Sequence, residues 1–200
     1  MIMQPFIQPE SDQQAWDIVE KYAHTMTYVQ HVTLDSQGLV NIQGDVTFRE
    51  PPLRGDLIKH RLPMRFGKIS GSFVARNLEL ITLEGAPHTV THTFNVGSNK
   101  LTDLTNGPKV ALGIYQAGNN PLISLKGLPE QGVHHFLCTY HDQLPLLRLV
   151  QVKDVGLNHA EDAHVPIMHI IKKYVGKGKE QVLNFAMELK QAGYTGNAKW

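Results

Sequence analysis

Hydrophobic positions in the middle of the chain repeat every 21 residues. Aromatic residues, small residues and leucines each keep this step, in four columns: Phe73, Phe94, Tyr115 and Phe136; Ala75, Val96, Ala117 and Cys138; Leu80, Leu101 and Leu122; and Leu83, Leu104, Leu125 and Leu146. A fixed period of this length is typical of a solenoid, whose units stack to bury one continuous column. Within a unit the aromatic and small residues are two apart, as in a strand that points both into the core. The pattern predicts about four stacked coils with parallel strands over residues 61–149.

Residues 1–60 are predicted to form an N-terminal cap of one helix and short strands. Ser11 and Gln14 make a capping box, and apolar residues at helical spacing predict a helix near 12–25. A β-prone stretch follows, broken at Gln37-Gly38 and at Gly44-Asp45. Such a cap would cover the apolar edge that the first coil otherwise exposes.

Residues 150–200 are predicted to form a C-terminal cap of two antiparallel helices. Pro166 suits a first helical turn, and Gly176 ends the apolar stripe that follows it. That stripe consists of Ile167, Ile170, Ile171 and Tyr174. A second helix is predicted near 179–192, with Gly193 as its stop. The chain as a whole is predicted to be α+β, a short leucine-rich-repeat-like solenoid between two caps.

Composition narrows the possible partners. The 19 basic and 18 acidic residues give a formal net charge of +1, so there is no strongly basic field to attract nucleic acid. A single cysteine excludes an internal disulfide framework and fits a reducing compartment. No apolar stretch approaches the ~20 residues needed to cross a bilayer. We therefore expect a cytoplasmic protein with neither nucleic acid nor membrane as its partner.

Several segments carry a family resemblance. The repeat units are Leu83-Glu84-Gly85-Ala86-Pro87, Ser98-Asn99-Lys100-Leu101-Thr102-Asp103-Leu104 and Asn119-Asn120-Pro121-Leu122-Ile123-Ser124-Leu125, and the tail segments are Leu144–Leu149, Lys173–Lys179 and Ala192–Lys199. Together they resemble the degenerate leucine-rich-repeat-like proteins common in tailed bacteriophages. The resemblance covers roughly residues 62–200. It implies a solenoid fold and a phage origin, but no established activity.

Asparagines at the corners of the repeat are expected to hydrogen-bond backbone groups of a tight turn. Asn99 and Asn120 occupy this position in successive units. Two neighbours depart from the pattern, because Asn77 comes one position early in a longer unit and His141 stands where the last asparagine would be. We therefore expect the first and last coils to be distorted.

The sequence contains little that indicates catalysis. His88 and His92 are four apart, but Pro87 and the β-prone residues after them argue against one helical face, and no Cys or carboxylate completes a zinc site by spacing. Cys138 belongs to an inward column, which favours an inert core thiol over a nucleophile paired with His141. There is no P-loop, nucleophile elbow or dinucleotide fingerprint. We predict no catalytic residue, no metal, no cofactor and no enzymatic activity.

The residues that flank the inward pair are the candidate partner-binding site. Side chains alternate along a strand, so these residues would point to the exposed face of the sheet. They are Val74, Arg76, Thr93, Asn95, Ile114, Gln116, His135, Leu137 and Thr139. Three of them are apolar on a face that should be solvated, which either marks a contact surface or merely suits a strand.

These observations favour a non-enzymatic scaffold that binds a host or phage protein through its sheet face. In a phage setting, the expected purpose is to block a host defence or to redirect a host enzyme. Two alternatives stay open. The protein could bind a small ligand or nucleotide, or act as a hydrolase, through a His-rich edge at His134, His135 and His141 and the turn Lys177-Gly178-Lys179. It could also be a virion component, whose sheet face holds capsid or tail parts together.

Overall fold

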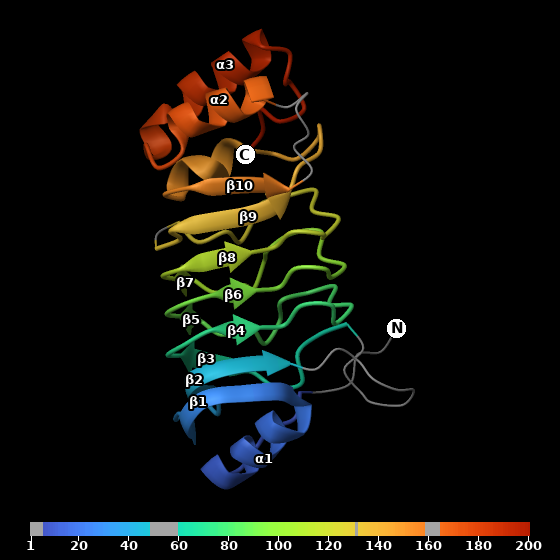
Figure 1. Cartoon of the computed structure of the whole chain (residues 1–200), viewed down its shortest axis with the longest axis vertical. Coiled ribbons are helices and arrows are strands. Elements are labelled where there is room, and N and C mark those ends of the chain that lie inside the picture. The colour runs from blue at the N-terminus through green and yellow to red at the C-terminus, as the bar shows by residue number, and fades with distance from the viewer. Residues whose placement is uncertain (1–5, 49–59, 131, 159–164) are drawn as a thin grey trace.

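A computed structural model describes residues 6–48, 60–130, 132–158 and 165–200. It shows a tall stack of coils with helices at both ends (Figure 1). The helices are α1 (Asp12–Tyr22) at the N-terminal end, and α2 (Val165–Tyr174) and α3 (Val182–Gln191) at the C-terminal end. The predicted α+β solenoid between an N-terminal and a C-terminal cap is therefore confirmed.

The strands of the described chain form one ten-stranded sheet. They are β1 (Ala23–Leu34), β2 (Val40–Phe48), β3 (Phe66–Ile69), β4 (Phe73–Val74), β5 (Thr89–Val90), β6 (Phe94–Asn95), β7 (Val110–Ala111), β8 (Ile114–Gln116), β9 (His135–Thr139) and β10 (Val155–Asn158). Their spatial order is β10, β9, β8, β6, β4, β2, β3, β5, β7. The strands along this path pair in parallel, and β1 pairs with β2 antiparallel.

The first three coils each contain two short strands rather than the one that the repeat predicted. The chain bends between β3 and β4, between β5 and β6, and between β7 and β8. The sheet therefore has two arms, β3-β5-β7 and β4-β6-β8-β9-β10, and β2 belongs to both. Within β2, Ile42 pairs with Ile69 of β3, and Val46 pairs with Phe73 of β4.

The aromatic column forms the centre of the core. Phe73, Phe94, Tyr115 and Phe136 are all fully buried. Their ring centroids are 5.7, 4.9 and 5.7 Å apart along the stack, within the range of favourable aromatic pairs. The small-residue and leucine columns are buried as well. The inward registers predicted from the 21-residue step are therefore confirmed.

Tyr115 brings a polar atom into this apolar column. Its hydroxyl is buried and has no hydrogen-bond partner in the described chain. Burial raises the pKa of Tyr115 far above its ordinary value. A Cβ at Gly107 would lie 2.7 Å from this hydroxyl, so the glycine leaves the space that the oxygen occupies.

Asn99 links neighbouring coils through its side chain, as the corner position predicted. Its Oδ1 accepts hydrogen bonds from the backbone N–H groups of Leu78 at 2.9 Å and Leu80 at 3.0 Å. Its Nδ2 donates to the carbonyl oxygens of Ala75 at 2.8 Å and Val96 at 2.9 Å. The buried amide thereby satisfies turn groups that have no partner in a strand ladder.

The asparagine ladder changes at both of the predicted departures. Asn120 repeats this pattern one coil later, except that its Oδ1 accepts from one backbone N–H, that of Leu101, instead of two. In the first coil Leu78 occupies the equivalent position, and Asn77 is exposed with φ +56°. In the last coil the ring of His141 replaces the amide, with its Nε2 2.6 Å from the carbonyl oxygen of Leu122.

The N-terminal cap differs from the prediction at the end of its helix. Ser11 caps α1 through its Oγ, which accepts from the N–H of Gln14 at 3.2 Å. The helix ends at Tyr22, and the next residues begin β1, in which Met26 pairs with Val46 of β2. The predicted end near residue 25 is therefore wrong, because pairing with β2 outweighs the local helical spacing.

The C-terminal cap contains the two predicted helices and also one more strand. β10 pairs with β9, so the sheet continues past residue 149, where the solenoid was predicted to end. A 3₁₀ turn at Lys179–Gln181 precedes α3. Glu188 of α3 joins the helices, because its Oε2 accepts from Nζ of Lys173 and from the hydroxyl of Tyr174, each at 2.6 Å. These bonds lower the pKa of Glu188.

Candidate interaction face

The structure brings the predicted partner-binding residues onto one face of the sheet. Strands β4, β6, β8 and β9 lie side by side (Figure 1). One row across these strands is Val74, Asn95, Gln116 and Leu137, each in register with the next. The other predicted residues flank this row along the strands. The whole set forms the interaction face: Val74, Arg76, Thr93, Asn95, Ile114, Gln116, His135, Leu137 and Thr139.

Apolar side chains lie toward the β8 and β9 side of the interaction face. Ile114 is 39% exposed, and Leu137 is half-buried. The side chain of Leu137 packs over Gly156 of β10, since a Cβ at Gly156 would collide with it. Leu112, at the bend between β7 and β8, is 44% exposed, and its side chain lies near Gly132, outside the interaction face. Val74 is half-buried on the other side of the face.

Some polar groups of the interaction face are already used within the chain. Asn95 Oδ1 accepts from the N–H of Gly97 at 3.0 Å, and Thr139 Oγ1 accepts from the N–H of Asn119 at 2.7 Å. The amide of Gln116 has no hydrogen bond within the described residues, although it is only half-buried. Gln116 is therefore available to a partner next to the apolar side chains.

Charged and imidazole groups lie at the β9–β10 side of the face. Nδ1 of His135 is 2.7 Å from Oδ2 of Asp154, and both side chains are solvent-accessible. Nζ of Lys153 lies 3.0 Å from Nε2 of His134, to which the ammonium donates. The His135–Asp154 pair gives the face a polar border near Leu137.

The structure separates the residues of the alternative His-rich site. His134 and His135 lie at the start of β9, whereas His141 follows its end and is bonded to the Leu122 carbonyl. Lys179, from the Lys-Gly-Lys turn, pairs with Glu130 at 2.8 Å. Across the residues that the structure describes, no three His, Cys, Asp or Glu side chains are grouped so that they could hold a metal ion.

Cys138 occupies the inward position that its column predicted. It is fully buried, and burial raises the pKa of its thiol to about 12. A thiol with this pKa forms almost no thiolate near neutral pH, and the thiolate is the reactive species. The structure therefore gives no support to a nucleophilic role for Cys138.

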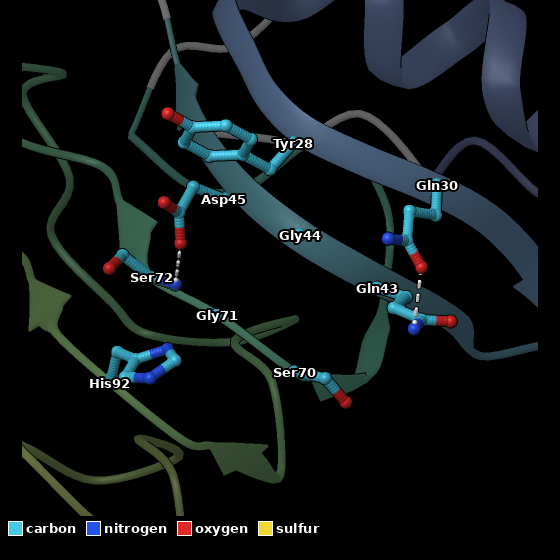
Figure 2. Close-up of a pocket in the computed structure, with 9 residues that line it drawn as sticks. All are labelled: Tyr28, Gln30, Gln43, Gly44, Asp45, Ser70, Gly71, Ser72 and His92. Atoms are coloured by element: carbon cyan, nitrogen blue, oxygen red, sulfur yellow. Dashed lines mark hydrogen bonds between the residues drawn. The ribbon is translucent and has the colours of Figure 1, made fainter.

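A cleft of about 410 Å³ lies where β1 and β2 meet the bend between β3 and β4 (Figure 2). Its lining consists of Tyr28, Gln30, Gln43, Gly44, Asp45, Ser70, Gly71, Ser72 and His92. The sequence missed this cleft, because its walls come from the predicted N-terminal cap and from the repeat.

Gly44 explains how the cleft wall is built. The strand break predicted at Gly44-Asp45 is wrong, since β2 runs through both residues. Gly44 has φ +136°, and a Cβ there would lie 2.5 Å from the Cα of Val29. The glycine therefore allows β1 to approach β2 closely, rather than ending the strand.

Comparison of this chain with protein-family models, with curated proteins and with solved structures finds no match. Among the helices that the structure describes, none combines the length and the apolar character needed to cross a membrane.

Proposed function

We propose that this protein is a non-enzymatic scaffold that binds a protein partner through the interaction face. The observation that supports this most directly is the 39% exposure of Ile114 on β8, next to β9 with its half-buried Leu137. An apolar centre within a polar rim is the usual anatomy of a protein interface. Gln116 adds an unpaired amide at the edge of this centre.

The stacked strands make the interaction face suitable for binding without rearrangement. Each strand of the face is fixed by the buried aromatic ring next to its outward residues. Side chains held on a rigid surface lose less conformational entropy when they are covered by a partner. Solenoids generally present extended binding surfaces of this kind.

The nature of the partner is proposed from the resemblance to phage leucine-rich-repeat-like proteins. On that basis the partner is a host or phage protein, met in the cytoplasm of the infected cell. Interference with a host defence, or redirection of a host enzyme, is the purpose that this setting favours.

A matched pair of isoleucine substitutions tests the position of the binding surface. Ile114→Asp places a carboxylate among the apolar side chains of the face, whereas Ile123→Asp places the same group at a 70% exposed isoleucine outside it. Tagged wild-type protein and both variants are used for affinity capture from infected and uninfected bacterial lysates, with mass identification of bound proteins. We expect Ile123→Asp to retain the wild-type partner and Ile114→Asp to bind it more than about 30-fold more weakly.

Two results would contradict the proposal. Equal capture of the partner by both variants, and also by Leu137→Asp, would place the binding surface elsewhere. A retained nucleotide or metal ion without any protein would favour the ligand-binding alternative. Purified phage particles are the separate test for a virion component, since a structural part must be found in them.

A further inference from the structure

Tyr28 projects its ring over the cleft from an irregular segment of β1. The pairing of β1 with β2 is interrupted between Thr27 and His31, and Tyr28 lies in this interval with φ +54°. Residues other than Gly, Asn and Asp rarely adopt this left-handed conformation. The side chain is 84% exposed, so burial of the ring does not offset the strain. Backbone strain of this kind is concentrated at ligand sites.

Bare backbone forms part of the cleft wall. Figure 2 shows Gly44 and Gly71 between the side chains of Gln43, Asp45 and Ser72. A Cβ at Gly71 would collide with the carbonyl oxygen of Gly44. Two glycines at this position therefore let neighbouring segments of the cleft wall approach each other closely.

The polar side chains of the cleft retain hydrogen-bond donors and acceptors that are not used within the chain. Nε2 of Gln43 donates to Oε1 of Gln30 at 2.8 Å, which leaves the Gln43 oxygen and the Gln30 amide N–H groups for a ligand. Asp45 Oδ1 accepts from the N–H of Ser72 at 2.6 Å, which leaves Oδ2 as a further acceptor. The ring of His92, across the cleft, has no hydrogen bond within the described chain.

This combination of groups selects among classes of ligand. Among the described residues that line the cleft there is no lysine or arginine, and Asp45 would repel an anion, so phosphates and carboxylates are poorly matched. Tyr28 is the only large apolar surface among these described residues, so a wholly apolar ligand is also poorly matched. A ring with many hydroxyl groups and an apolar C–H face fits both the amides and the exposed aromatic ring.

We propose that this cleft binds a neutral saccharide. One face of a pyranose ring stacks on Tyr28, and its hydroxyls bond to Gln30, Gln43 and Asp45. The cleft volume of about 410 Å³ lies within the range of small-molecule sites, which is roughly 300–1,000 Å³. The lining of the cleft shares no residue with the interaction face, although His92 directly precedes Thr93, so it would be a second binding activity. Its ligand is either a free sugar or the terminal unit of a glycan.

Saturation-transfer NMR tests the proposal with defined probes. The probes are the methyl pyranosides of glucose, galactose, mannose and N-acetylglucosamine, with methyl glucuronide as the anionic comparison. Tyr28→Asn removes the ring but keeps a residue that tolerates positive φ, so the fold is preserved. Tyr28→Phe retains the ring and serves as the matched control. Circular dichroism and thermal melting verify that each variant is folded.

We expect signal transfer to the ring protons of at least one neutral pyranoside. The transfer should persist in Tyr28→Phe and fall at least about tenfold in Tyr28→Asn, while the glucuronide gives less transfer than its neutral counterpart. Absence of transfer to every neutral probe at millimolar concentration would overturn the proposal. Equal transfer in Tyr28→Asn, or stronger transfer to the glucuronide, would do so as well. Tighter binding of a trisaccharide than of its monosaccharide would identify a glycan as the source.

Discussion

Replacing Asn99 with alanine tests whether the corner asparagines hold neighbouring coils together. The residue is only 6% exposed, and its Oδ1 accepts from two backbone N–H groups of the preceding coil, those of Leu78 and Leu80. Both leucines are buried, so water cannot replace the lost acceptor without opening the turn. An unpaired buried donor costs about 1–3 kcal/mol, so we expect the free energy of unfolding to fall by about 2–6 kcal/mol. A loss of ~4 kcal/mol corresponds to a decrease of roughly 8–16 °C in Tm.

Two other asparagines provide graded controls for Asn99→Ala. Oδ1 of Asn120 accepts from one buried N–H, that of Leu101, and Asn95 is half-buried and accepts only from Gly97. The expected order of destabilisation is therefore Asn99→Ala, then Asn120→Ala, then Asn95→Ala. Urea denaturation followed by circular dichroism measures all three. If the free energies of unfolding of Asn99→Ala and Asn95→Ala differ by less than about 1 kcal/mol, the corner asparagines do not stabilise the stack as the structure indicates.

Three further predictions concern single groups. Tyr115→Phe removes a buried hydroxyl that has no partner in the described chain, so urea denaturation should show a gain of about 1–2 kcal/mol, and a loss would reveal a missed hydrogen bond. Cys138 should not react with a disulfide reagent at pH 8 until the protein unfolds, because burial raises its pKa to about 12, and rapid reaction of the folded protein would contradict that burial. Glu188→Gln tests pH dependence, because hydrogen bonds from Lys173 and Tyr174 lower the folded-state pKa of Glu188. The stability that the ionised carboxylate contributes is present above its ordinary pKa of 4.5, and it is lost as the pH falls through the folded-state pKa. Wild type should therefore exceed Glu188→Gln in Tm at neutral pH but not in strong acid, and an equal gap at both would refute the assignment.

The inward columns could be predicted from the sequence because stacked coils repeat one burial pattern at one interval. The second arm of the sheet keeps the same interval, in Ile69, Val90 and Ala111, but these residues are not among the predicted columns. Ile69 precedes the aromatic residue of its unit by four positions, a spacing that one continuous strand would also allow, but the position midway between them is Gly71, His92 or Gly113 rather than an apolar residue. The structure shows a bend at this point, which separates the two inward residues into two strands.

The two candidate sites differ in how far the sequence could predict them. The interaction face follows from alternation along strands whose inward residues are already known, so its residues could be named in advance. The cleft depends on where Tyr28 and Gln30 of β1 lie relative to Ser70 and Ser72 of the repeat. That arrangement is set by the interrupted pairing of β1 with β2, for which the sequence carries no local signal.

The double pairing of β2 has a consequence for how the protein is made on the ribosome. The β1–β2 hairpin joins segments that are close in sequence, so it is complete before either arm has been synthesised. The second strand of the hairpin, β2, then pairs with β3 through Val40 and Ile42 and with β4 through Val46 and Thr47. Each later strand of either arm pairs with one that has already emerged, up to β10. The chain is thus suited to folding in the order of its synthesis, with the C-terminal helices closing the stack last.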